Sequence, residues 1–334
     1  MYSDYFVYIN ISGCYSVQYS WMSLMIDSQE YLYTRYLSAK KTLDDRSLNK
    51  HVWNNLSRSL QQLSLNKTLN ILELGAGIGT MIERMIEHGL LNNAVYSAID
   101  IDSKNIDEAS SRLKKWARFN GFKIFPIRNN LFTIKNDQKK ITVNLEVKGL
   151  SEFMNRKKNY RKWDLLVAHA FLDLIDLPSS IPSILKLLKP NGLFYFTLNF
   201  DGMTIFQPEI DANLEEQIIT QYHKTIDQRY INGKPSGDSK TGRNLYCLLR
   251  NSATEIIDIG SSDWIVFPRK EGYFADEAYF LHYVINTIYQ ALRVNPLLNK
   301  NDILKWIEKR HVQIDQKELI YITHQLDYLG RKAT

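Results

Sequence analysis

The chain has 334 residues, 44% of them hydrophobic and 23% charged, with a formal net charge of +6 and a pI near 9.0. These shares are ordinary for a globular protein and exclude a disordered one, and the length suffices for one large α/β domain with insertions. The positive charge is mild and is spread along the sequence without long basic runs, so we expect no nucleic-acid partner.

The cysteine content and the hydropathy of the chain indicate a soluble cytoplasmic protein. Only Cys14 and Cys247 occur, too few for a disulfide framework and without the spacing of a metal site. No apolar run is long enough to span a membrane, and the first 34 residues contain no Lys or Arg of the kind that opens a signal peptide. We therefore expect neither a membrane contact nor a bound metal.

The first 27 residues are rich in Tyr and Ser and lack helical periodicity. Either Met22 or Met25 is the true start, or this segment is an extra strand or arm that packs on the core. Helices are predicted next, over 28–37 and 48–63. The second helix carries three apolar residues on one face, at Val52, Leu56 and Leu60.

An apolar strand predicted over 69–74 runs into an amphipathic helix predicted over 79–89. Three alternating glycines lie at the junction, Gly75, Gly77 and Gly79. Glycine permits positive φ and a close approach of a ligand to the backbone, but the G-x-G-x-G spacing differs from the G-x-G-x-x-G of dinucleotide sites. Glu73 would repel a pyrophosphate and suits an ammonium group, which favours S-adenosylmethionine over NAD. The alternative is a turn that only packs tightly.

The next strand, predicted over 94–99, ends at Asp100, 25 residues after the first glycine. A carboxylate at this position can accept both hydroxyls of a ribose. Asp102 competes for this role, but it lies beyond the end of the strand. We therefore favour Asp100.

Beyond a helix over 104–118, the sequence predicts an inserted hairpin over 122–134 and the third core strand over 141–147. The later elements alternate between strands and helices. The remaining predicted strands are 163–168, 193–198, 255–259 and 319–326, and the remaining predicted helices are 181–188, 214–229, 243–250, 276–292 and 302–312. A basic cluster over 156–162 is expected to be a solvated helix end and loop.

Four blocks of the sequence, in order, resemble the class I S-adenosylmethionine-dependent methyltransferases. The blocks are Glu73-Leu74-Gly75-Ala76-Gly77-Ile78-Gly79, Ala98-Ile99-Asp100-Ile101-Asp102, Trp163-Asp164-Leu165-Leu166-Val167-Ala168-His169 and Leu187-Leu188-Lys189-Pro190-Asn191-Gly192-Leu193-Phe194-Tyr195-Phe196. The resemblance implies a Rossmann-like α/β fold: a seven-stranded, mostly parallel sheet of order 3-2-1-4-5-7-6 with an antiparallel last strand and helices on both faces. It also implies an N-terminal arm with cap helices over 1–64, a methyltransferase domain over 65–334, and helical lid insertions at about 201–240 and 270–315.

The resemblance implies S-adenosylmethionine as the cofactor, held at the strand ends. The implied contacts are Glu73, Gly75, Ala76, Gly77, Gly79, Asp100, Ile101, Gly149, Leu150 and His169. The family usually has an acidic residue against the adenine amino group after the third strand, where this chain has Lys148, Gly149 and Leu150. Leu150 and the backbone around Gly149 would then hold the adenine, or Asn129 or Asn130 of the hairpin would contact it.

In open parallel sheets, ligands bind at the carboxyl ends of the strands, so the residues after the fourth strand are candidates for catalysis. His169 is the first candidate for a base, because its unperturbed pKa of about 6.5 suits proton abstraction. Asp173 is the second. Alternatively, His169 only orients the cofactor or bonds a carbonyl, and Asp173 caps a helix. The candidate substrate contacts are Asp201, Tyr222, His223, Arg229, Arg243 and Trp264; Tyr222, Arg229 and Arg243 would form a lid over an anionic acceptor.

The resulting hypothesis is a methyltransferase that acts on oxygen, nitrogen or carbon of a small molecule. Two alternatives stay open: a methyltransferase for RNA or protein, and a protein that binds S-adenosylmethionine without activity. The Asn/Asp-Pro-Pro-Tyr motif of amide and adenine methylation is missing after the fourth strand, and neither cysteine has the Pro-Cys setting of a cytosine C5 methyltransferase. The sequence predicts neither the acceptor nor the oligomeric state.

Overall fold

The computed structural model describes residues 31–64, 67–231 and 233–333. The described part from Tyr31 onward belongs to one compact unit. The expectations for residues 1–27 lie outside the described residues, and the division of the chain between residues 64 and 65 stays a prediction.

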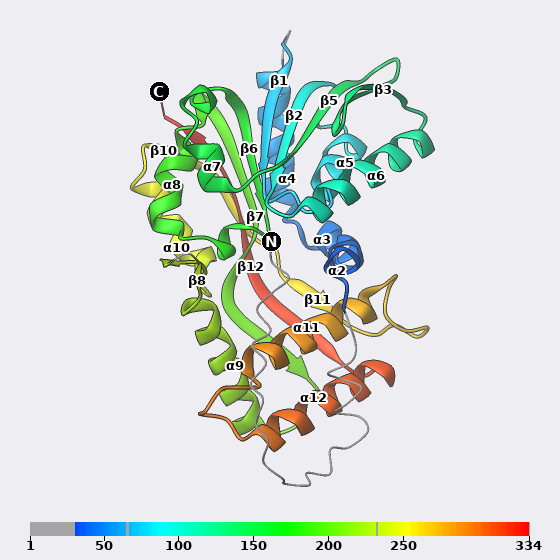
Figure 1. Cartoon of the computed structure of the whole chain (residues 1–334), viewed down its shortest axis with the longest axis vertical. Helices are drawn as coiled ribbons and strands as arrows, with labels where there is room; N and C mark the ends of the chain where they lie inside the picture. Colours follow the sequence, from blue (N-terminus) through cyan, green and yellow to red (C-terminus); the bar gives the residue numbers. More distant parts are fainter. Residues whose placement is uncertain (1–30, 65–66, 232, 334) are drawn as a thin grey trace, which may run out of the picture. The chain divides into compact units, whose positions relative to one another are not determined.

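A twisted sheet forms the centre of this unit (Figure 1). Its five parallel strands, in spatial order, are β7 (Leu188–Gln207), β6 (Trp163–His169), β1 (Leu69–Leu74), β2 (Asn93–Asp100) and β5 (Lys140–Val147). Beyond β7, β12 (Ile320–Lys332) pairs antiparallel with β7, and β10 (Thr254–Ser261) pairs with β12. The seven core strands therefore have the order 3-2-1-4-5-7-6 with an antiparallel last strand, and the Rossmann-like fold class is confirmed.

Shorter strands extend this sheet at its edges. The predicted hairpin is present as β3 (Lys123–Arg128) and β4 (Leu131–Lys135), which adds to the sheet beside β5. At the other side, β11 (Trp264–Val266) pairs with β12. A separate small hairpin consists of β8 (Tyr230–Ile231) and β9 (Lys234–Pro235). The position of β3 at the end of the sheet leaves one of its edges unpaired within the described residues.

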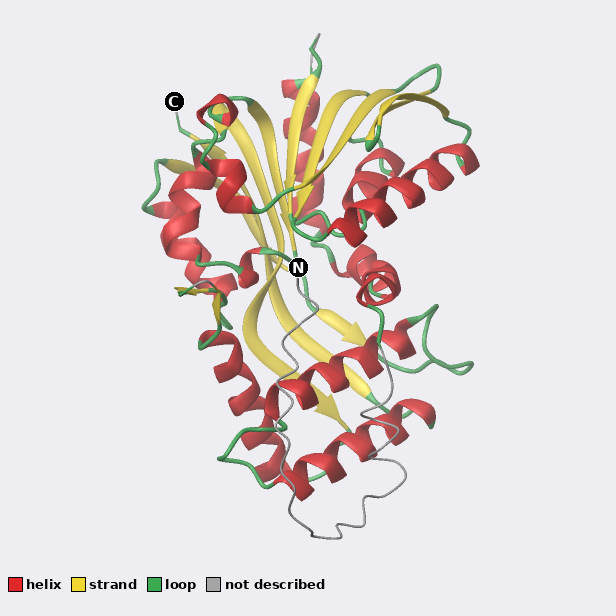
Figure 2. Ribbon diagram, in the orientation of Figure 1, coloured by secondary structure: helices red, strands yellow, loops and turns green. Residues whose placement is uncertain are grey.

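Helices cover both faces of the sheet, as predicted (Figure 2). One face packs against α4 (Lys50–Leu63), α5 (Thr80–Glu87) and α6 (Ser103–Phe119). The other face packs against α7 (Leu150–Met154), α8 (Leu177–Leu185) and α10 (Thr241–Arg250). The three apolar residues predicted to share a face of α4 are its buried residues. This burial on both sides explains why β6 is apolar along nearly its whole length.

Two strands are much longer than predicted. The fifth core strand was predicted to end at residue 198, but β7 continues to Gln207 because β12 remains paired with it as far as Ile320. Leu198 and Gly202 have positive φ, of 53° and 75°, and the pairing register shifts nearby. The sequence at these irregular positions resembles the end of a strand. In the structure they are β-bulges, and β7 remains paired with β12 on both sides of them.

The extensions of β7 and β12 support a second layer of helices (Figure 2). Its members are α9 (Ala212–Asp227), α11 (Glu277–Leu292) and α12 (Lys300–Asp315). Phe206 of β7 contacts the rings of Trp306 and Tyr321, with centroids 5.6 and 5.1 Å away. This layer therefore shares its core with the far ends of the two long strands.

Short helices fill the remaining connections. Near the start of the described chain, α2 (Tyr33–Ala39) and α3 (Lys41–Ser47) precede α4, and the sequence did not predict α3. Two 3₁₀ turns, η1 (Lys157–Asn159) and η2 (Leu172–Leu174), flank β6. Both α7 and η2 follow the carboxyl ends of core strands, so they adjoin the candidate cofactor site.

Candidate functional site

The glycine turn after β1 adopts the left-handed backbone conformation that its three glycines permit. Gly75, Gly77 and Gly79 all have left-handed φ, of 64°, 52° and 78°. A Cβ at Gly75 would lie 2.1 Å from the ring of Phe171, and one at Gly77 would lie 3.2 Å from a methyl group of Leu37. Positive φ and close contact thus both favour glycine here. The atoms close to these two glycines belong to side chains of the protein, after β6 and on α2. Tight packing, the alternative to a ligand site, therefore accounts for part of the role of these glycines.

Asp100 joins the end of β2 to this turn. Its carboxylate accepts the N–H of Gly77 at 2.9 Å, the N–H of Asp102 at 2.9 Å and the side-chain amide of Asn105 at 3.2 Å. The carboxylate of Asp102 instead caps α6 by accepting the N–H of Lys104 at 2.8 Å. The two acids therefore have different tasks, and Asp100 is the one that contacts the turn.

Glu73 does not lie where the sequence argument needs it. Its carboxyl is buried beneath α5 and accepts the hydroxyl of Tyr96 at 2.9 Å. Burial raises the pKa of Glu73 to about 8, although Tyr96 and Arg84 oppose the shift. A carboxyl that is mostly protonated at neutral pH and packed inside the core cannot offer its charge to an ammonium group at the turn. We therefore withdraw Glu73 as a cofactor contact.

The residues expected around an adenine lie side by side at the ends of β2 and β5. Lys148 donates its N–H to the carbonyl of Asp100 at 2.7 Å, which fixes the two strand ends together. Gly149 then begins α7, and a Cβ on it would lie 3.7 Å from the Cδ1 of Ile101. Ile101 is 66% exposed, and Leu150 is half-buried. Together these residues make an apolar wall beside Asp100.

Ala76 and Asn130 make backbone hydrogen bonds that join neighbouring segments. Ala76 donates its N–H to the carbonyl of Ile99 at 3.0 Å, which ties the turn to β2. Asn129 and Asn130 form the tip of the hairpin, where the carbonyl of Asn130 accepts the N–H of Leu145 at 2.8 Å. The alternative contact from these asparagines to an adenine stays a prediction.

His169 is held by protein groups at both ring nitrogens. Nδ1 lies 2.8 Å from the hydroxyl of Thr197, and Nε2 lies 3.1 Å from Asp44 of α3. Burial lowers the pKa of His169 to about 4, although Asp44 opposes this shift. In the neutral ring, one nitrogen donates to Asp44 and the other accepts from Thr197. Because no lone pair is left for a substrate, this geometry argues against His169 as a base.

Asp44, which the sequence did not single out, organises this buried network. Its carboxylate also accepts from Lys40 at 2.7 Å and from the indole of Trp264 at 3.0 Å. Burial by itself would raise the pKa of Asp44, but Lys40 and His169 hold it below its ordinary value. Trp264 is thereby tied to Asp44 and packs edge-on against Phe280, so it forms part of the core and not an open aromatic wall. Its predicted substrate contact is corrected accordingly.

Asp173, on η2, has an unusual setting for a carboxyl group. Its Oδ1 is buried and has no hydrogen-bond partner among the described residues. Burial raises the pKa of Asp173, while the charge of Arg229 opposes the shift. Asp173 does not occupy a capping position, because the N-cap of η2 is Phe171 and the N-cap of α8 is Asp176. Asp173 therefore offers a free acceptor two residues beyond Phe171, the residue that covers Gly75.

Two tyrosines, Tyr33 and Tyr222, lie close enough to Asp173 for its charge to affect their pKa. Burial raises the pKa of Tyr222 to about 12, and the next cause is the charge of Asp173. Burial also raises the pKa of Tyr33, with further contributions from Tyr283, Asp100 and Asp173. Tyr33 of α2 and Tyr283 of α11 were not candidates, because no local pattern links these two helices to the strand ends.

The predicted lid of arginines is not present. Arg229 donates to the backbone carbonyls of Ser236 and Asp173, the latter at 3.2 Å, so it fastens the β8–β9 hairpin to η2. Arg243 forms a two-pronged pair with Asp201, at 2.9 and 3.0 Å. Both cations already have partners in the protein, which argues against the predicted lid that binds an anion.

His223 lies farther along α9, with its Nε2 3.1 Å from the hydroxyl of Thr204 on β7. Its ring also contacts Phe200 at 5.3 Å between centroids. Burial lowers the pKa of His223, so the ring is neutral at pH 7. It lines β7 next to Tyr222, and its role as a substrate contact stays a prediction.

Neither a metal site nor a membrane span is found in the described residues. No cluster of three or more His, Cys, Asp or Glu side chains could hold a metal ion within residues 31–64, 67–231 and 233–333. Over the same ranges, no helix is long and apolar enough to cross a membrane.

Comparison with known proteins finds likeness in backbone only. No protein-family model matches the chain, and none of the curated proteins matches it. Among solved structures, the chain is similar to the [4+2]-cyclase SpnF (12% identity, TM-score 0.39, covering 84% of this chain and 81% of that one). It is also similar to a putative sarcosine dimethylglycine methyltransferase from Galdieria sulphuraria (12%, 0.39, 84% and 86%) and to geranyl diphosphate methyltransferase in complex with S-adenosylmethionine (7%, 0.40, 84% and 85%). Sequence identities this low carry no argument about function, which has to be argued from the residues of this chain.

Proposed function

We propose that this chain is an S-adenosylmethionine-dependent methyltransferase that acts on a small molecule. The observation that carries the proposal is the contact between Asp100 and Gly77, which joins an acid at the end of β2 to a left-handed glycine turn at the end of β1. A carboxylate in this position suits the hydroxyls of a ribose. The glycine spacing departs from that of a pyrophosphate site, which argues against NAD.

The residues around this contact fit the ribose and the adenine of S-adenosylmethionine. Asp100 uses three of its roughly four acceptor positions, and the neighbouring Asn105 has a buried carbonyl oxygen without a partner among the described residues, so hydroxyl donors are suited there. Ile101 and Leu150 offer apolar surface for an adenine ring. Asp173, whose buried Oδ1 has no partner among the described residues, offers a further hydrogen-bond acceptor on this side of the sheet.

The chain's contribution to such a reaction is positioning. S-adenosylmethionine supplies an activated methyl group, and transfer needs the acceptor atom to be held in line with it. Since both nitrogens of His169 are occupied, the site favours an acceptor that reacts without losing a proton to a histidine. This supports a neutral amine or another nucleophile of that kind more than an alcohol.

The surroundings of Asp173 support a narrower acceptor class. The groups near it include the hydroxyls of Tyr33 and Tyr222, while Arg229 donates to the backbone carbonyl of Asp173. Phenol rings and a carboxylate suit an uncharged or cationic molecule. The acceptor we propose is therefore not an anion, in contrast to the sequence-based expectation.

Titration calorimetry with the purified chain tests this proposal. We expect S-adenosylmethionine and its product S-adenosylhomocysteine to bind and NAD to give no heat. Preference for NAD, or no binding of either sulfur compound, would refute the cofactor assignment. Binding without methyl transfer to any member of an amine and phenol panel would instead favour a cofactor-binding protein that lacks activity.

A further inference from the structure

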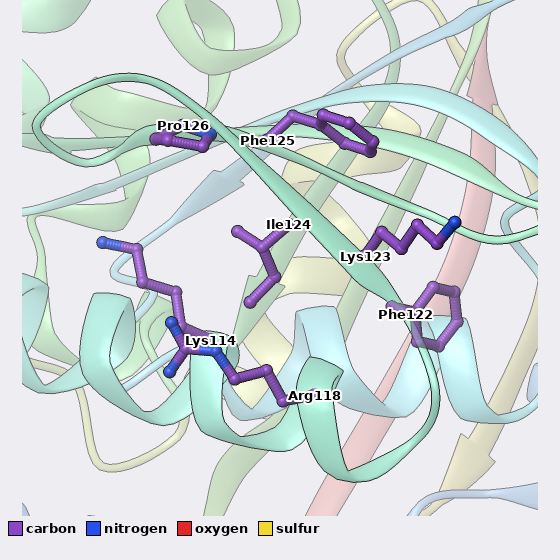
Figure 3. A pocket seen from close by; sticks show the side chains of 7 residues that line it. All are labelled: Lys114, Arg118, Phe122, Lys123, Ile124, Phe125 and Pro126. Carbon is purple, nitrogen blue, oxygen red and sulfur yellow. The ribbon is translucent and has the colours of Figure 1, made fainter.

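A groove lies between the C-terminal half of α6 and the edge strand β3 (Figure 3). Its volume is about 650 Å³, within the range of roughly 300–1,000 Å³ typical of ligand sites. The lining residues are Lys114, Arg118, Phe122, Lys123, Ile124, Phe125 and Pro126. The groove is separate from the residues around Asp100 and Asp173, and the proposed methyl transfer does not use it.

The charged residues that line this groove are all positive. Residues 109–136 contain seven Lys or Arg residues and no Asp or Glu. Arg112 is paired with Glu83, but no salt bridge joins Lys114, Arg118 or Lys123 to a carboxylate within the described ranges. Uncompensated cations that lie in one groove attract a polyanion. No basic run in this stretch is long, and a turn separates α6 from β3, so only the fold shows that these cations share one groove.

Aromatic rings stand between these cations. Phe122 stacks on Trp116 with ring centroids 5.6 Å apart, which fixes the base of the groove. Phe125 lines the groove and is 49% exposed, and Phe119 at the end of α6 is 90% exposed. Exposed rings next to Lys and Arg are the elements with which proteins bind single strands: the cations contact phosphates, and unpaired bases stack on the rings.

We propose that this groove binds single-stranded nucleic acid. Lys114, Arg118 and Lys123 would contact successive phosphates, and Phe125 would stack on a base. This inference goes beyond the proposed methyl transfer, which does not depend on it. It revises the expectation, drawn from the dispersed charge of the sequence, that no nucleic acid is a partner.

Two other polyanionic or acidic partners fit the groove less well. A bilayer is flat and cannot enter a groove between a helix and a strand. An acidic peptide could pair with the free edge of β3, but Pro126 lacks an N–H and the pairing of β3 with β4 is irregular between Pro126 and Arg128. A flexible single strand agrees best with these features, because it would contact side chains of the groove and would not pair with the backbone of β3.

The groove is also connected to the proposed cofactor site through the sheet. From the groove, β3 runs to the hairpin tip, where Asn130 accepts the N–H of Leu145 on β5. Three residues farther along, Lys148 donates to the carbonyl of Asp100. A strand bound along β3 would therefore point toward the side of the sheet where S-adenosylmethionine is proposed to bind.

Fluorescence anisotropy with a labelled oligonucleotide of twelve uridines tests the proposal on the whole chain. The groove variant is Arg118→Ala/Lys123→Ala, and the matched control is Lys157→Ala/Lys158→Ala, which removes the same charge from the exposed basic cluster near η1. We expect the groove variant to bind at least 10-fold more weakly and the control within about 3-fold of the unaltered chain. The slope of log K against log salt should fall by about 1.4 in the groove variant, at about 0.7 per phosphate contact.

A third variant separates stacking from charge. Phe125→Ala should weaken binding at least 5-fold with the salt slope unchanged, because stacking releases no counterions. All four positions changed in the paired variants are exposed, and circular dichroism melting would verify that each variant folds.

Three results would overturn the proposal. The first is no binding of the oligonucleotide in 50 mM salt, and the second is an equal loss in the groove and control variants. The third is binding to phosphatidylserine vesicles, but not to the oligonucleotide, with the same dependence on Arg118 and Lys123, which would make the groove part of a lipid-binding surface. Calorimetry with S-adenosylmethionine on the same groove variant should give unchanged affinity, so a failure here is distinguishable from a failure of the proposed function.

Discussion

Asp100 and Asp102 are two residues apart, yet their side chains serve different parts of the molecule. Asp100 accepts from the glycine turn, whereas Asp102 caps α6. An N-cap residue contributes to helix stability, typically about 1 kcal/mol, without contacting a ligand. The difference between the two acids therefore offers a matched pair for testing the cofactor site.

We predict that Asp100→Ala weakens binding of S-adenosylmethionine by about 1–3 kcal/mol, the typical cost of losing hydrogen bonds to a charged group. Asp102→Ala should leave that affinity unchanged and lower the free energy of unfolding by about 1 kcal/mol. Calorimetry and urea unfolding of both variants measure these effects. An affinity that depends on Asp102 and not on Asp100 would transfer the ribose contact to the capping acid.

Residue roles could be predicted from the sequence only where the backbone determines them. The positive φ of the glycines and the place of Asp100 at a strand end follow from local pattern. Glu73, His169 and Arg229 were assigned by position along the chain, but their partners Tyr96, Asp44 and Ser236 come from distant or differently folded segments. The direction of a side chain depends on such partners, which no short motif specifies.

At the scale of elements, α2 packs against the glycine turn. Its Leu37 contacts the Gly77 position, and its Tyr36 stacks on Tyr283 of α11 with ring centroids 4.1 Å apart. Arg35 adds a two-pronged pair with Asp276 just before α11, at 3.0 Å, but both side chains are about half exposed, so this pair adds little stability. Ring packing is thus the main attachment of α2.

We predict that Tyr36→Ala lowers the free energy of unfolding by about 2 kcal/mol, from lost burial and lost ring contacts. Tyr36→Phe keeps the ring and should cost less than about 1 kcal/mol. Urea unfolding monitored by fluorescence measures both. Equal losses in the two variants would show that the hydroxyl, and not the stacked ring, attaches the helix.

Element types were predicted well, and element ends less well. Periodicity identified α4, α6, α11 and the core strands, because each buries one face or both, whereas the order of the strands came from the resemblance to the methyltransferase family. The extension of β7 was missed, since it depends on continued pairing with β12, more than a hundred residues away. The short α3 and α7 are too brief to show a period.

The whole molecule contains buried acids whose ionisation would cost stability. Burial raises the pKa of Glu73 to about 8, above its usual 4.5. Between these values the unfolded chain has the carboxylate ionised and the folded chain keeps it protonated. The folded state therefore binds more protons, and stability falls as the pH rises from about 4.5 to about 8.

We predict that Glu73→Gln removes this dependence, because glutamine does not titrate and can still accept from Tyr96. At pH 5 the variant should unfold at nearly the same temperature as the unaltered chain, and at pH 8 it should be more stable by up to about 4 kcal/mol, since one pKa unit corresponds to about 1.4 kcal/mol. Thermal unfolding at both values measures the difference. A gain of equal size at pH 5 and pH 8 would mean that repacking, and not ionisation, is responsible.

The length of β7 and β12 limits how the molecule can move. Both strands run without interruption from the sheet that carries the glycine turn to the layer that carries α9, α11 and α12. These two paired strands, and not a flexible linker, join the two layers. We therefore expect the entry of a ligand to depend on small shifts of single helices. The first helix expected to shift is α2, which is attached through the ring of Tyr36.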